Sequence, residues 1–485
     1  MKQLYIIAIL LSIALAAAPK GARAAIETDA PKEKISHGQK EFLDRVERDT
    51  FRFFWDTANP RNGLVPDSFP GAKMCSVAGV GFALTSYAVG AKRHFITRAR
   101  AAERTLKTLD FLFNAPQSAN PGGAAGYKGF FYHFLRMDNG FRYEESELST
   151  IDTALLMAGV LSSEAYFDKD NPVEAKIRNR ARALYRRVDW PWASSRSSRP
   201  LLSMGWTPEK GFIRYDWAGY NEGMILYILA IGSPTHPIEA RAWDKWTMTY
   251  KWSDFCGYSY VNFGPVFGYQ YSHIWVDFRG IRDKYMAAKG IDYFINSRLA
   301  VYANQAYCVR NPGKWRGYGD MVWGLSASDG PGKTDVDSVL VPTRFHGYWA
   351  RGSSSGYTRD DGTISPSAAG GSVAFAPEIA IPTLQYFFQR FGSRLYGRFG
   401  FKDAFNLSFG SDSSKSPGWF DSHYLAIDQG PILLMIENYR SGFLWGLMKK
   451  NPSIRNGLER AGFSGGWLKP PYKPIIAARV TKAGD

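Results

Sequence analysis

The stretch Trp217-Ala-Gly-Tyr-Asn-Glu222-Gly-Met-Ile-Leu-Tyr-Ile-Leu-Ala-Ile-Gly-Ser-Pro-Thr-His236-Pro237 contains a helix that is apolar on every side, because 224–231 carries no charge. A helix without a polar face is buried all round, so the stretch predicts the inner layer of a helical fold. Glu222 lies at the N-terminal end of this helix, beside Trp217 and Tyr220. Two interpretations stay open: the carboxylate caps the helix, whose free N–H groups and dipole favour an anion, or it is a catalytic acid in an aromatic pocket.

Helical segments of two kinds recur along the chain. Apolar segments are predicted at 77–92, 150–166, 222–231, 377–391 and 431–448, and amphipathic segments at 95–113, 172–188, 237–247, 285–306 and 452–461. Inner helices buried on both sides and outer helices exposed on one side are what a two-layer ring requires. We therefore predict an all-α fold, an (α/α)6 barrel with long loops that form a cleft at one end. Strand-like stretches at 211–217 and 254–267 are assigned to these loops.

The N-terminus has the features of a cleavable signal peptide. Lys2 is followed by an apolar run from Leu4 to Ala18, and Ala22-Arg23-Ala24 resembles a cleavage site. The run is shorter than the roughly 20 apolar residues of a membrane span. We expect residues 1–24 to be this signal, 25–40 to be a loose leader and 41–485 to be one catalytic domain. The protein is then secreted or periplasmic, with no membrane span.

Composition points to a carbohydrate rather than a nucleic acid as the partner. The chain has 15 Trp, 27 Tyr and 32 Phe, an aromatic content that suits a groove where rings stack on sugars. Its formal net charge is +16, or +13 without the three cations of the predicted signal, but the Lys and Arg residues are scattered among acids. The basic run 178–187 has helical spacing and is interpreted as a solvated helix face. Nucleic acid is excluded because no recognition motif accompanies the charge.

Cysteine usage predicts neither a disulfide framework nor a metal centre. Cys75, Cys256 and Cys308 allow one disulfide with a free thiol, or three thiols, and both remain open. No Cys or His cluster has zinc-ligand spacing. We expect no metal and no other cofactor.

Carboxylates recur at the starts of the predicted inner helices. Asp152, Glu222 and Asp428 each lie there, and Glu147 directly precedes the first of these helices. Ser149 and Asp152 have capping-box-like spacing, so a structural role for Asp152 is an equal alternative. Alternate helices of a barrel point the same way, so the three carboxylates can meet in one cleft. Two such groups are the minimum for glycoside hydrolysis, in which one protonates the leaving oxygen and the other activates water or attacks the sugar.

A different carboxylate, Glu437, lies in the middle of a predicted inner helix. Burial of a carboxylate requires a partner, and Arg440 three residues later is the nearest candidate. We interpret this pair as structural.

Five sequence blocks resemble one family. They are Phe51-Arg-Phe-Phe-Trp55-Asp, Cys75-Ser-Val-Ala-Gly-Val-Gly-Phe-Ala-Leu, Glu147-Leu-Ser-Thr-Ile-Asp152-Thr-Ala-Leu, Tyr220-Asn-Glu222-Gly-Met and Asp428-Gln-Gly-Pro. In this order they resemble the bacterial glucoamylase-like proteins, a group that includes the endo-β-1,2-glucanases of glycoside hydrolase family 144. The resemblance runs from about residue 40 to 468.

The resemblance implies an (α/α)6 barrel and hydrolysis of β-1,2-glucan to short oligosaccharides, with anomeric inversion and without metal. It places the general acid at Glu222. It leaves the base between Asp428 and Asp152, with Asp428 slightly favoured. Inversion sets the two carboxyl groups about 6.5–9.5 Å apart, or further if water relays the proton.

Other residues are predicted to bind the sugar chain, because they are aromatic or polar and lie near these blocks or in probable loops. They are Glu147, Phe54, Trp55, Arg214, Tyr215, Trp217, His273, Arg279, His346, Tyr424 and Gln429. For His273 and His346 a structural role is an equal alternative, and His236 is interpreted as structural.

Three other functions stay open. The same scaffold can act on another glycan, by exo attack or transglycosylation. The basic composition suits a lyase for an acidic polysaccharide. A non-catalytic periplasmic glycan-binding protein would also keep the cleft.

Overall fold

The apolar segment Val77–Lys92 forms a helix over the predicted residues, and every side chain except that of Lys92 is buried. Ser76 caps it, because its hydroxyl accepts a hydrogen bond from the amide of Gly79 at 3.1 Å. Thr150–Tyr166 is likewise helical over the predicted range. The computed structural model describes residues 35–194, 200–332, 345–410 and 418–468.

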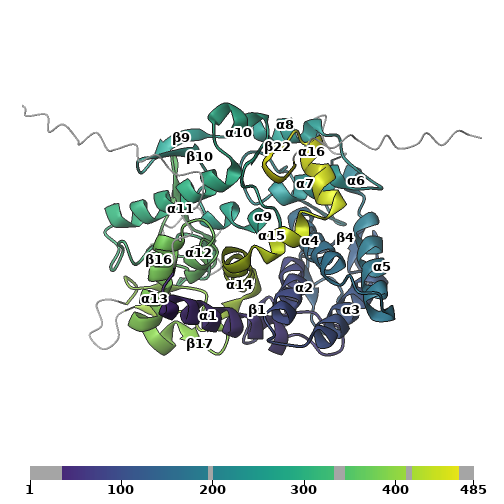
Figure 1. Cartoon of the computed structure of the whole chain (residues 1–485), viewed down its shortest axis with the longest axis horizontal. Helices are drawn as coiled ribbons and strands as arrows, with labels where there is room; N and C mark the ends of the chain where they lie inside the picture. Colours follow the sequence, from purple (N-terminus) through teal and green to yellow (C-terminus); the bar gives the residue numbers. More distant parts are fainter. Residues whose placement is uncertain (1–34, 195–199, 333–344, 411–417, 469–485) are drawn as a thin grey trace, which may run out of the picture. The chain divides into compact units, whose positions relative to one another are not determined.

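Helices dominate the described residues (Figure 1). The α-helices are α1 His37–Asp56, α2 Val77–Lys92, α3 Arg98–Asn114, α4 Thr150–Tyr166, α5 Pro172–Arg186, α6 Trp190–Ser194, α7 Met224–Gly232, α8 Arg241–Thr247, α9 Tyr271–Trp275, α10 Lys284–Lys289, α11 Tyr293–Arg310, α12 Pro366–Gly370, α13 Pro377–Phe391, α14 Ala426–Ser441, α15 Phe443–Met448 and α16 Pro452–Arg460. The prediction of a helical fold is confirmed at the level of class.

Short antiparallel strands fill the connections. They are β1 Ser68–Phe69, β2 Met74–Ser76, β3 Gly126–Tyr127, β4 Phe130–Phe131, β5 Phe134–Arg136, β6 Leu148–Ser149, β7 Gly205–Thr207, β8 Gly211–Phe212, β9 Trp252–Phe255, β10 Tyr258–Val261, β11 Ile281–Arg282, β12 Ala327–Ser328, β13 Trp349–Ala350, β14 Gly352–Ser354, β15 Tyr357–Arg359, β16 Thr363–Ile364, β17 Tyr396–Gly397, β18 Gly400–Phe401, β19 Phe405–Asn406, β20 Trp419–Phe420, β21 Tyr424–Leu425 and β22 Ser464–Gly465. The 3-10 turns are η1 Val266–Tyr269, η2 Gly392–Arg394 and η3 Gly466–Leu468.

The apolar helices that form the inner layer pack against one another. α2 contacts α4 and α14, α4 contacts α7, α7 contacts α9, and α14 contacts α9 and α12. In Figure 1, α14 lies between α12 and α2. Strands β2, β6 and β21 directly precede α2, α4 and α14, so the sheets fix where these helices begin.

Amphipathic helices cover this layer. α1 packs on α14 and α2, α3 on α2 and α5, α5 on α4, α16 on α7, and α13 on α12. In α5 the buried side chains include Ile177, Ala181 and Leu184, which recur at helical spacing, and the Arg side chains lie between them. The segments predicted to be amphipathic at 95–113, 172–188 and 452–461 therefore lie where solvent reaches one face. The prediction of an apolar helix at 377–391 is wrong, because Gln389 and Arg390 of α13 are exposed and this helix belongs to the outer group.

Two predicted helices are broken by glycine. The segment predicted at 285–306 is α10 followed by α11, separated at Gly290, whose φ of +75° suits glycine. The segment predicted at 431–448 is α14 followed by α15, separated at Gly442 with φ +64°. α14 also starts earlier than predicted, so Asp428 lies in its first turn and Pro431 lies inside the helix.

The predicted partner of Glu437 is wrong. Arg93 of the segment after α2 donates from Nε to Glu437 at 2.5 Å, whereas Arg440 pairs with Glu47 and Asp44 of α1. Glu47 and Glu437 are fully buried, and burial together with Glu437 raises the pKa of Glu47 to about 8. This network links α1 to α14.

Several further predictions concern the ends and the cysteines. The signal at 1–24 and most of the leader at 25–40 lie outside the described residues, and α1 already begins at His37. Cys75, Cys256 and Cys308 are all described, and none is disulfide-bonded. Among the described helices, none has the length and apolar character needed to cross a membrane.

Two glycines allow the closest approach between buried helices. A methyl group on Gly159 of α4 would lie 2.1 Å from the carbonyl oxygen of Gly81, and one on Gly81 of α2 would lie 2.4 Å from the carbonyl oxygen of Leu155. Both obstacles are backbone atoms, which cannot move aside as a flexible side chain can. The spacing of α2 and α4 therefore depends on glycine at both positions.

We expect Gly159→Ala to lower the free energy of unfolding by about 1–3 kcal/mol, because the added methyl pushes α4 away from α2. Gly446→Ala is the matched control, since Gly446 is an exposed residue of helix α15 with nothing within 4 Å of the new methyl. It should raise stability by about 0.4–1 kcal/mol. Urea unfolding measures both, and equal effects of the two substitutions would contradict the close contact.

Candidate functional site

A cavity of about 470 Å³ lies where the N-terminal ends of several buried helices meet. Its lining comes from the starts of α2, α4 and α9, from the residue before α7, and from the start of α14. The lining residues are Asp67, Ser68, Met74, Ser76, Ala78, His133, Phe134, Ile151, Asp152, Leu155, Glu222, Phe267, Tyr271, Ala327, Asp329, Tyr348, Leu425 and Ile427. Carboxyl groups and aromatic rings therefore line one cavity at the N-terminal ends of these helices.

Glu222 is half-buried in this lining, in the turn before α7. The hydroxyl of Ser272 donates to its backbone oxygen at 3.0 Å and also accepts from the amide of Ile225 at 3.0 Å, which ties the turn to α9. Burial raises the pKa of Glu222 to about 7, and the negative charge of Asp152 adds to the increase. Gly223, not Glu222, is the N-cap residue, and it makes no side-chain cap. The carboxyl group is thus available to the cavity and is often protonated near neutral pH.

Asp152 lies in the first turn of α4 and takes part in the cap that the sequence suggests. The hydroxyl of Ser149 accepts from the amide of Asp152 at 3.2 Å and donates to its Oδ2 at 2.5 Å. His133 lies close by, with Nε2 3.6 Å from Oδ1 of Asp152 and Nδ1 2.9 Å from Glu147. Asp152 therefore combines a capping role with a place in the cavity wall.

His133 holds the positive charge in this part of the cavity. Burial opposes its charged form, but Asp152 and Glu147 raise the pKa of the imidazole to about 9. Burial also opposes ionisation of Glu147, yet the bond from His133 lowers the pKa of that carboxyl. The imidazole ring of His133 stacks on the ring of Phe134, with centroids 4.0 Å apart. Sequence reasoning missed His133, because it lies in a loop between short strands with no motif around it.

Asp428 directly follows the lining residue Ile427, is 3% exposed and is not itself among the lining residues. Its carboxyl group is hydrogen-bonded to that of Asp403 and to Ser367. Burial raises the pKa of Asp428, whereas these two hydrogen bonds lower it in part. Asp403 was also missed by sequence reasoning, because it precedes a two-residue strand far from any helix mouth.

A second pair of carboxyl groups adjoins this one. Asp329 lines the cavity and is hydrogen-bonded to Asp421, whose Oδ1 lies 3.0 Å from Nδ1 of His423. Burial and Asp421 raise the pKa of Asp329 to about 6. Burial also raises the pKa of Asp67, on the cavity wall, to about 6. One possible ligand atom each of Asp329, Asp421 and His423 lies within 4.8 Å of the others.

Tyr271 links the two sides of the site. Pro431 has no N–H for the carbonyl of Ile427 four residues earlier, and the hydroxyl of Tyr271 donates to that carbonyl at 3.2 Å instead. Burial raises the pKa of Tyr271 well above its ordinary value, and Asp428, Glu222 and Asp152 all add to the shift. The phenol thus lies within the influence of all three predicted catalytic carboxylates.

Most predicted sugar-binding residues lie elsewhere. Phe54, His273 and Gln429 are fully buried. Burial lowers the pKa of His273 to about 3, and its Nε2 lies 3.0 Å from Ser297. Gln429 donates to the carbonyl of Phe401 at 2.8 Å. The structure uses these side chains in the core, which aromatic content alone does not distinguish from a sugar-binding groove.

The remaining predicted residues are not among the cavity-lining residues either, and they make contacts within the protein. Trp217 donates to Thr150 at 2.9 Å, Trp55 packs under Arg104, Arg279 pairs with Asp277, His346 stacks on Trp349, Tyr424 packs on Phe399, Arg214 lies over Tyr215, and Glu147 binds the lining residue His133. Tyr215 is 65% exposed. Of the predicted site residues, Asp152 and Glu222 line the cavity, and Asp428 lies directly behind its wall.

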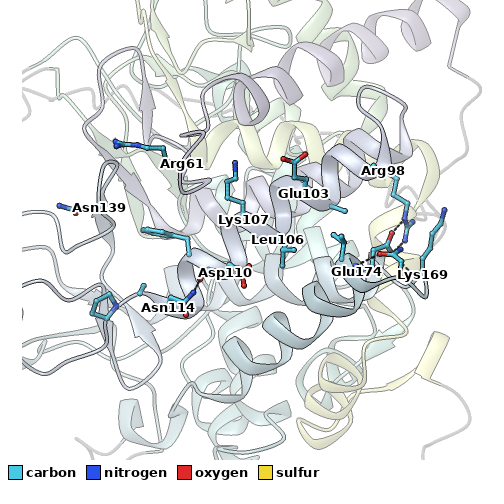
Figure 2. Close-up of a pocket in the computed structure, with 17 residues that line it drawn as sticks. Arg61, Arg98, Glu103, Leu106, Lys107, Asp110, Asn114, Asn139, Lys169 and Glu174 are labelled. Atoms are coloured by element: carbon cyan, nitrogen blue, oxygen red, sulfur yellow. Dashed lines mark hydrogen bonds and ion pairs between the residues drawn. The ribbon is translucent and has the colours of Figure 1, made fainter.

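A larger cavity lies away from these carboxylates. It has a volume of about 920 Å³ and runs between α3 and α5 (Figure 2). Figure 2 shows Glu103 and Lys107 along α3, and Arg98 bonded to Glu174 at its end. Lys176 and Arg180 pair with Asp110 there. Arg98, Asp110 and Glu174 of its lining are thus engaged in ion pairs, so the smaller cavity is the better candidate for chemistry.

Several known proteins are similar to this chain in sequence and in structure. A family model described as "Putative glucoamylase" matches residues 214–452, which include Glu222 and Asp428. A solved protein from Bacteroides uniformis, described as a putative glucoamylase, is 34% identical with a TM-score of 0.77, over 90% of this chain and 100% of that one. The endo-β-1,2-glucanase of Chitinophaga pinensis, solved with sophorotriose and glucose, is 29% identical with a TM-score of 0.76, over 90% and 100%.

A curated relative is similar as well. It is the exo β-1,2-glucooligosaccharide sophorohydrolase (non-reducing end) of Parabacteroides distasonis, 28% identical over 453 residues. The match covers 87% of this chain but spans only 58% of the relative's length. Taken together, these likenesses define a family of helical carbohydrate-active proteins. The chain belongs to the putative glucoamylase family.

We expect His133→Gln to cost stability in a pH-dependent way. The folded pKa of about 9 lies above the ordinary 6.5, so the contribution of His133 is complete below about pH 6 and is lost as the pH rises to about 9. The difference between wild type and variant should shrink by about 1–3 kcal/mol across this window in urea unfolding. His37→Gln, at a side chain 87% exposed, is the control and should show little change. A difference that grows with pH would contradict the charged state of His133.

Proposed function

We propose that this protein is a glycoside hydrolase that cleaves β-1,2-glucan to short oligosaccharides, with Glu222 as general acid. The observation that carries the proposal is the carboxyl group of Glu222, half-buried in the cavity with a pKa of about 7. A general acid has to hold its proton at the working pH and release it to the leaving oxygen. The endo- and exo-acting relatives support β-1,2-glucan as the substrate class.

The base in this proposal is Asp428. An inverting reaction needs a second carboxylate that accepts a proton as water attacks the anomeric carbon. Asp152 accepts a hydrogen bond from the Ser149 hydroxyl and lies 3.6 Å from His133, so its carboxylate oxygens are already engaged by two protein partners. Asp428 has no cationic partner among its recorded neighbours, and its raised pKa makes it the stronger base once it is ionised.

The charges of the lining support a neutral glycan rather than a polyanion. Ionisable groups of the described lining are Asp67, Asp152, Glu222, Asp329, His133, Tyr271 and Tyr348, and no Lys or Arg is among them. Carboxylates of an acidic polysaccharide would be repelled here, whereas sugar hydroxyls donate to carboxylates. Tyr348, which is 47% exposed, offers a ring for stacking. The cavity therefore favours hydrolysis of a glucan over a lyase reaction.

The proposal includes an (α/α)6 barrel as the scaffold. Its inner ring would be α2, α4, α7, α9, α12 and α14, and the contacts that join successive members support it. Gln270, the residue before α9, links α9 to α12. Its side-chain amide donates to the carbonyl of Ala368 and to the hydroxyl of Ser372, both at 2.9 Å. Return of α14 to α2 would close the ring.

Export is also part of the proposal. Lys2, the apolar run that follows it and Ala22-Arg23-Ala24 support a cleaved signal. A polymeric glucan has to be shortened before uptake, so a hydrolase outside the cytoplasm fits this chemistry.

We expect Glu222→Gln to reduce kcat on linear β-1,2-glucan by about 10²–10⁴-fold, because the amide has no proton to give to the leaving group. Wild-type activity should fall as the pH rises through about 7, where the acid ionises. Chain-length analysis of the products measures the rate and separates internal cleavage from release of a fixed short unit.

Glu239→Gln is the matched control, since Glu239 is a surface residue paired with Arg241. It should leave the rate unchanged. Equal activity of wild type and Glu222→Gln would remove Glu222 as the acid, and sugar binding without turnover on any glycan would favour a binding protein.

Asp428→Asn should reduce kcat by about 10²–10⁴-fold with little change in KM, since the base acts only in the transition state. Asp152→Asn should have the smaller effect on kcat and should lower stability, because Asp152 accepts from Ser149. Steady-state kinetics and thermal unfolding of both variants measure this. The reverse order of the kcat losses would assign the base to Asp152.

A further inference from the structure

Asp403 is a buried carboxyl group directly behind Asp428, and it is 1% exposed. Its backbone is fixed on both sides: the amide donates to the carbonyl of His423 at 3.0 Å, and the carbonyl accepts from Ser365 at 2.8 Å. Its Oδ2 accepts from the amide of Asp329 at 2.7 Å. One oxygen of Asp403 is thus committed to a backbone donor.

The other oxygen has a different neighbour. Oδ1 of Asp403 and Oδ2 of Asp428 are both buried, and neither receives a hydrogen bond from a conventional donor among the described residues. The two carboxyl groups are nevertheless hydrogen-bonded to each other. Two carboxylate oxygens can form such a bond only around a proton, so the pair binds one proton while the other member is ionised.

The surroundings decide which member holds the proton. The groups that face Asp403 are Asp428 of α14, Asp329 after β12, Asp421 after β20 and the Tyr348 hydroxyl, and the histidine in the same network, His423, bonds to Asp421. No cation is among the groups recorded against Asp403. Burial and Asp428 raise its pKa well above the ordinary value, whereas the bonds from Asp403 and Ser367 favour the ionised form of Asp428.

We propose that Asp403 is a positioning residue whose protonated carboxyl donates a hydrogen bond to Asp428 and holds that carboxylate ionised at the cavity wall. The inference deepens the proposed function, because it rests on Asp428 as the base. Asp403 accepts from the amide of Asp329 with one oxygen and donates to Asp428 from the other. An asparagine amide offers the same acceptor and donor in the same order.

The test compares Asp403→Asn with Asp403→Ala on linear β-1,2-glucan. Asparagine keeps both hydrogen bonds, so kcat should stay within about threefold of wild type and KM should not change. Alanine removes the donor, so kcat should fall about tenfold or more, and the acidic limb of the pH profile should move upward because Asp428 then protonates more easily. A loss in Asp403→Asn as large as in Asp428→Asn would overturn the proposal, since Asp403 would then be needed as a carboxylate.

A second measurement needs no substrate. A carboxyl group that is protonated in the fold binds a proton that the unfolded chain releases above about pH 4, so wild-type stability falls as the pH rises from there. The Asp403→Asn variant has no carboxyl group at this position to bind the proton, so its Tm relative to wild type should rise between pH 4 and pH 8. A Tm that falls relative to wild type over this range would mean that Asp403 is ionised in the fold, which overturns the proposal.

The two measurements separate the possible failures. Wild type that does not cleave β-1,2-glucan, combined with the expected rise in relative Tm, would refute the proposed substrate and support the protonated Asp403. Cleavage by wild type, combined with a falling relative Tm, would refute the role of Asp403 and leave the hydrolase intact.

Discussion

Carboxyl groups outnumber cations in the cavity, and the protein keeps them together by sharing protons and hydrogen bonds rather than by neutralising them with Lys or Arg. His133 is the one strongly cationic side chain recorded in the described lining, and it serves Asp152 and Glu147. On the other side, Asp403 and Asp428 share a hydrogen bond, as do Asp329 and Asp421. Burial then raises the pKa of Glu222, and the negative charge of Asp152 adds to the increase. The acidity of each carboxyl group is therefore set by its neighbours and not by its residue type.

Helix packing makes this concentration of charge possible. The N-terminal ends of α2, α4, α7 and α14 reach the same cavity, and the partial positive charge of each end favours anions there. Such convergence needs buried helices that lie close together, which Gly81 and Gly159 permit between α2 and α4. Pro431 adds a further link, because the carbonyl that it leaves free accepts the hydroxyl of Tyr271. The apolar sequence of these helices thus determines that they form a buried layer. Glycine and proline residues within the helices determine the spacing between them, on which the site depends.

The helical class and the position of Asp152 and Glu222 beside one cavity could be predicted because both depend on local pattern. An apolar run such as 224–231 is stable only when it is buried on all sides, and a carboxylate at its start faces outward from the N-terminal end of the helix. Asp67, His133, Asp329 and Asp403 could not be found in this way, since each comes from a loop whose course is set by long-range strand pairs. Phe54 and His273 show the opposite error: aromatic composition predicts sugar contacts and core packing equally well, and both residues lie in the core. Helix ends at Gly290 and Gly442 were missed because the apolar pattern continues across them.

An acid and a base made from the same functional group have to differ in proton affinity at one pH. Glu222 reaches a pKa of about 7 mainly by desolvation, which keeps its proton available. Asp428 is more deeply buried, so desolvation alone would keep it protonated as well and would leave the site with two acids. In the proposed mechanism a neighbour that donates a hydrogen bond opposes this effect, because it stabilises the charged form of Asp428 without adding a cation that would weaken the base. Among the described residues, Asp403 and Ser367 are the groups placed to do so. In the proposed mechanism, the separation of acid from base therefore depends on residues that need not touch the sugar.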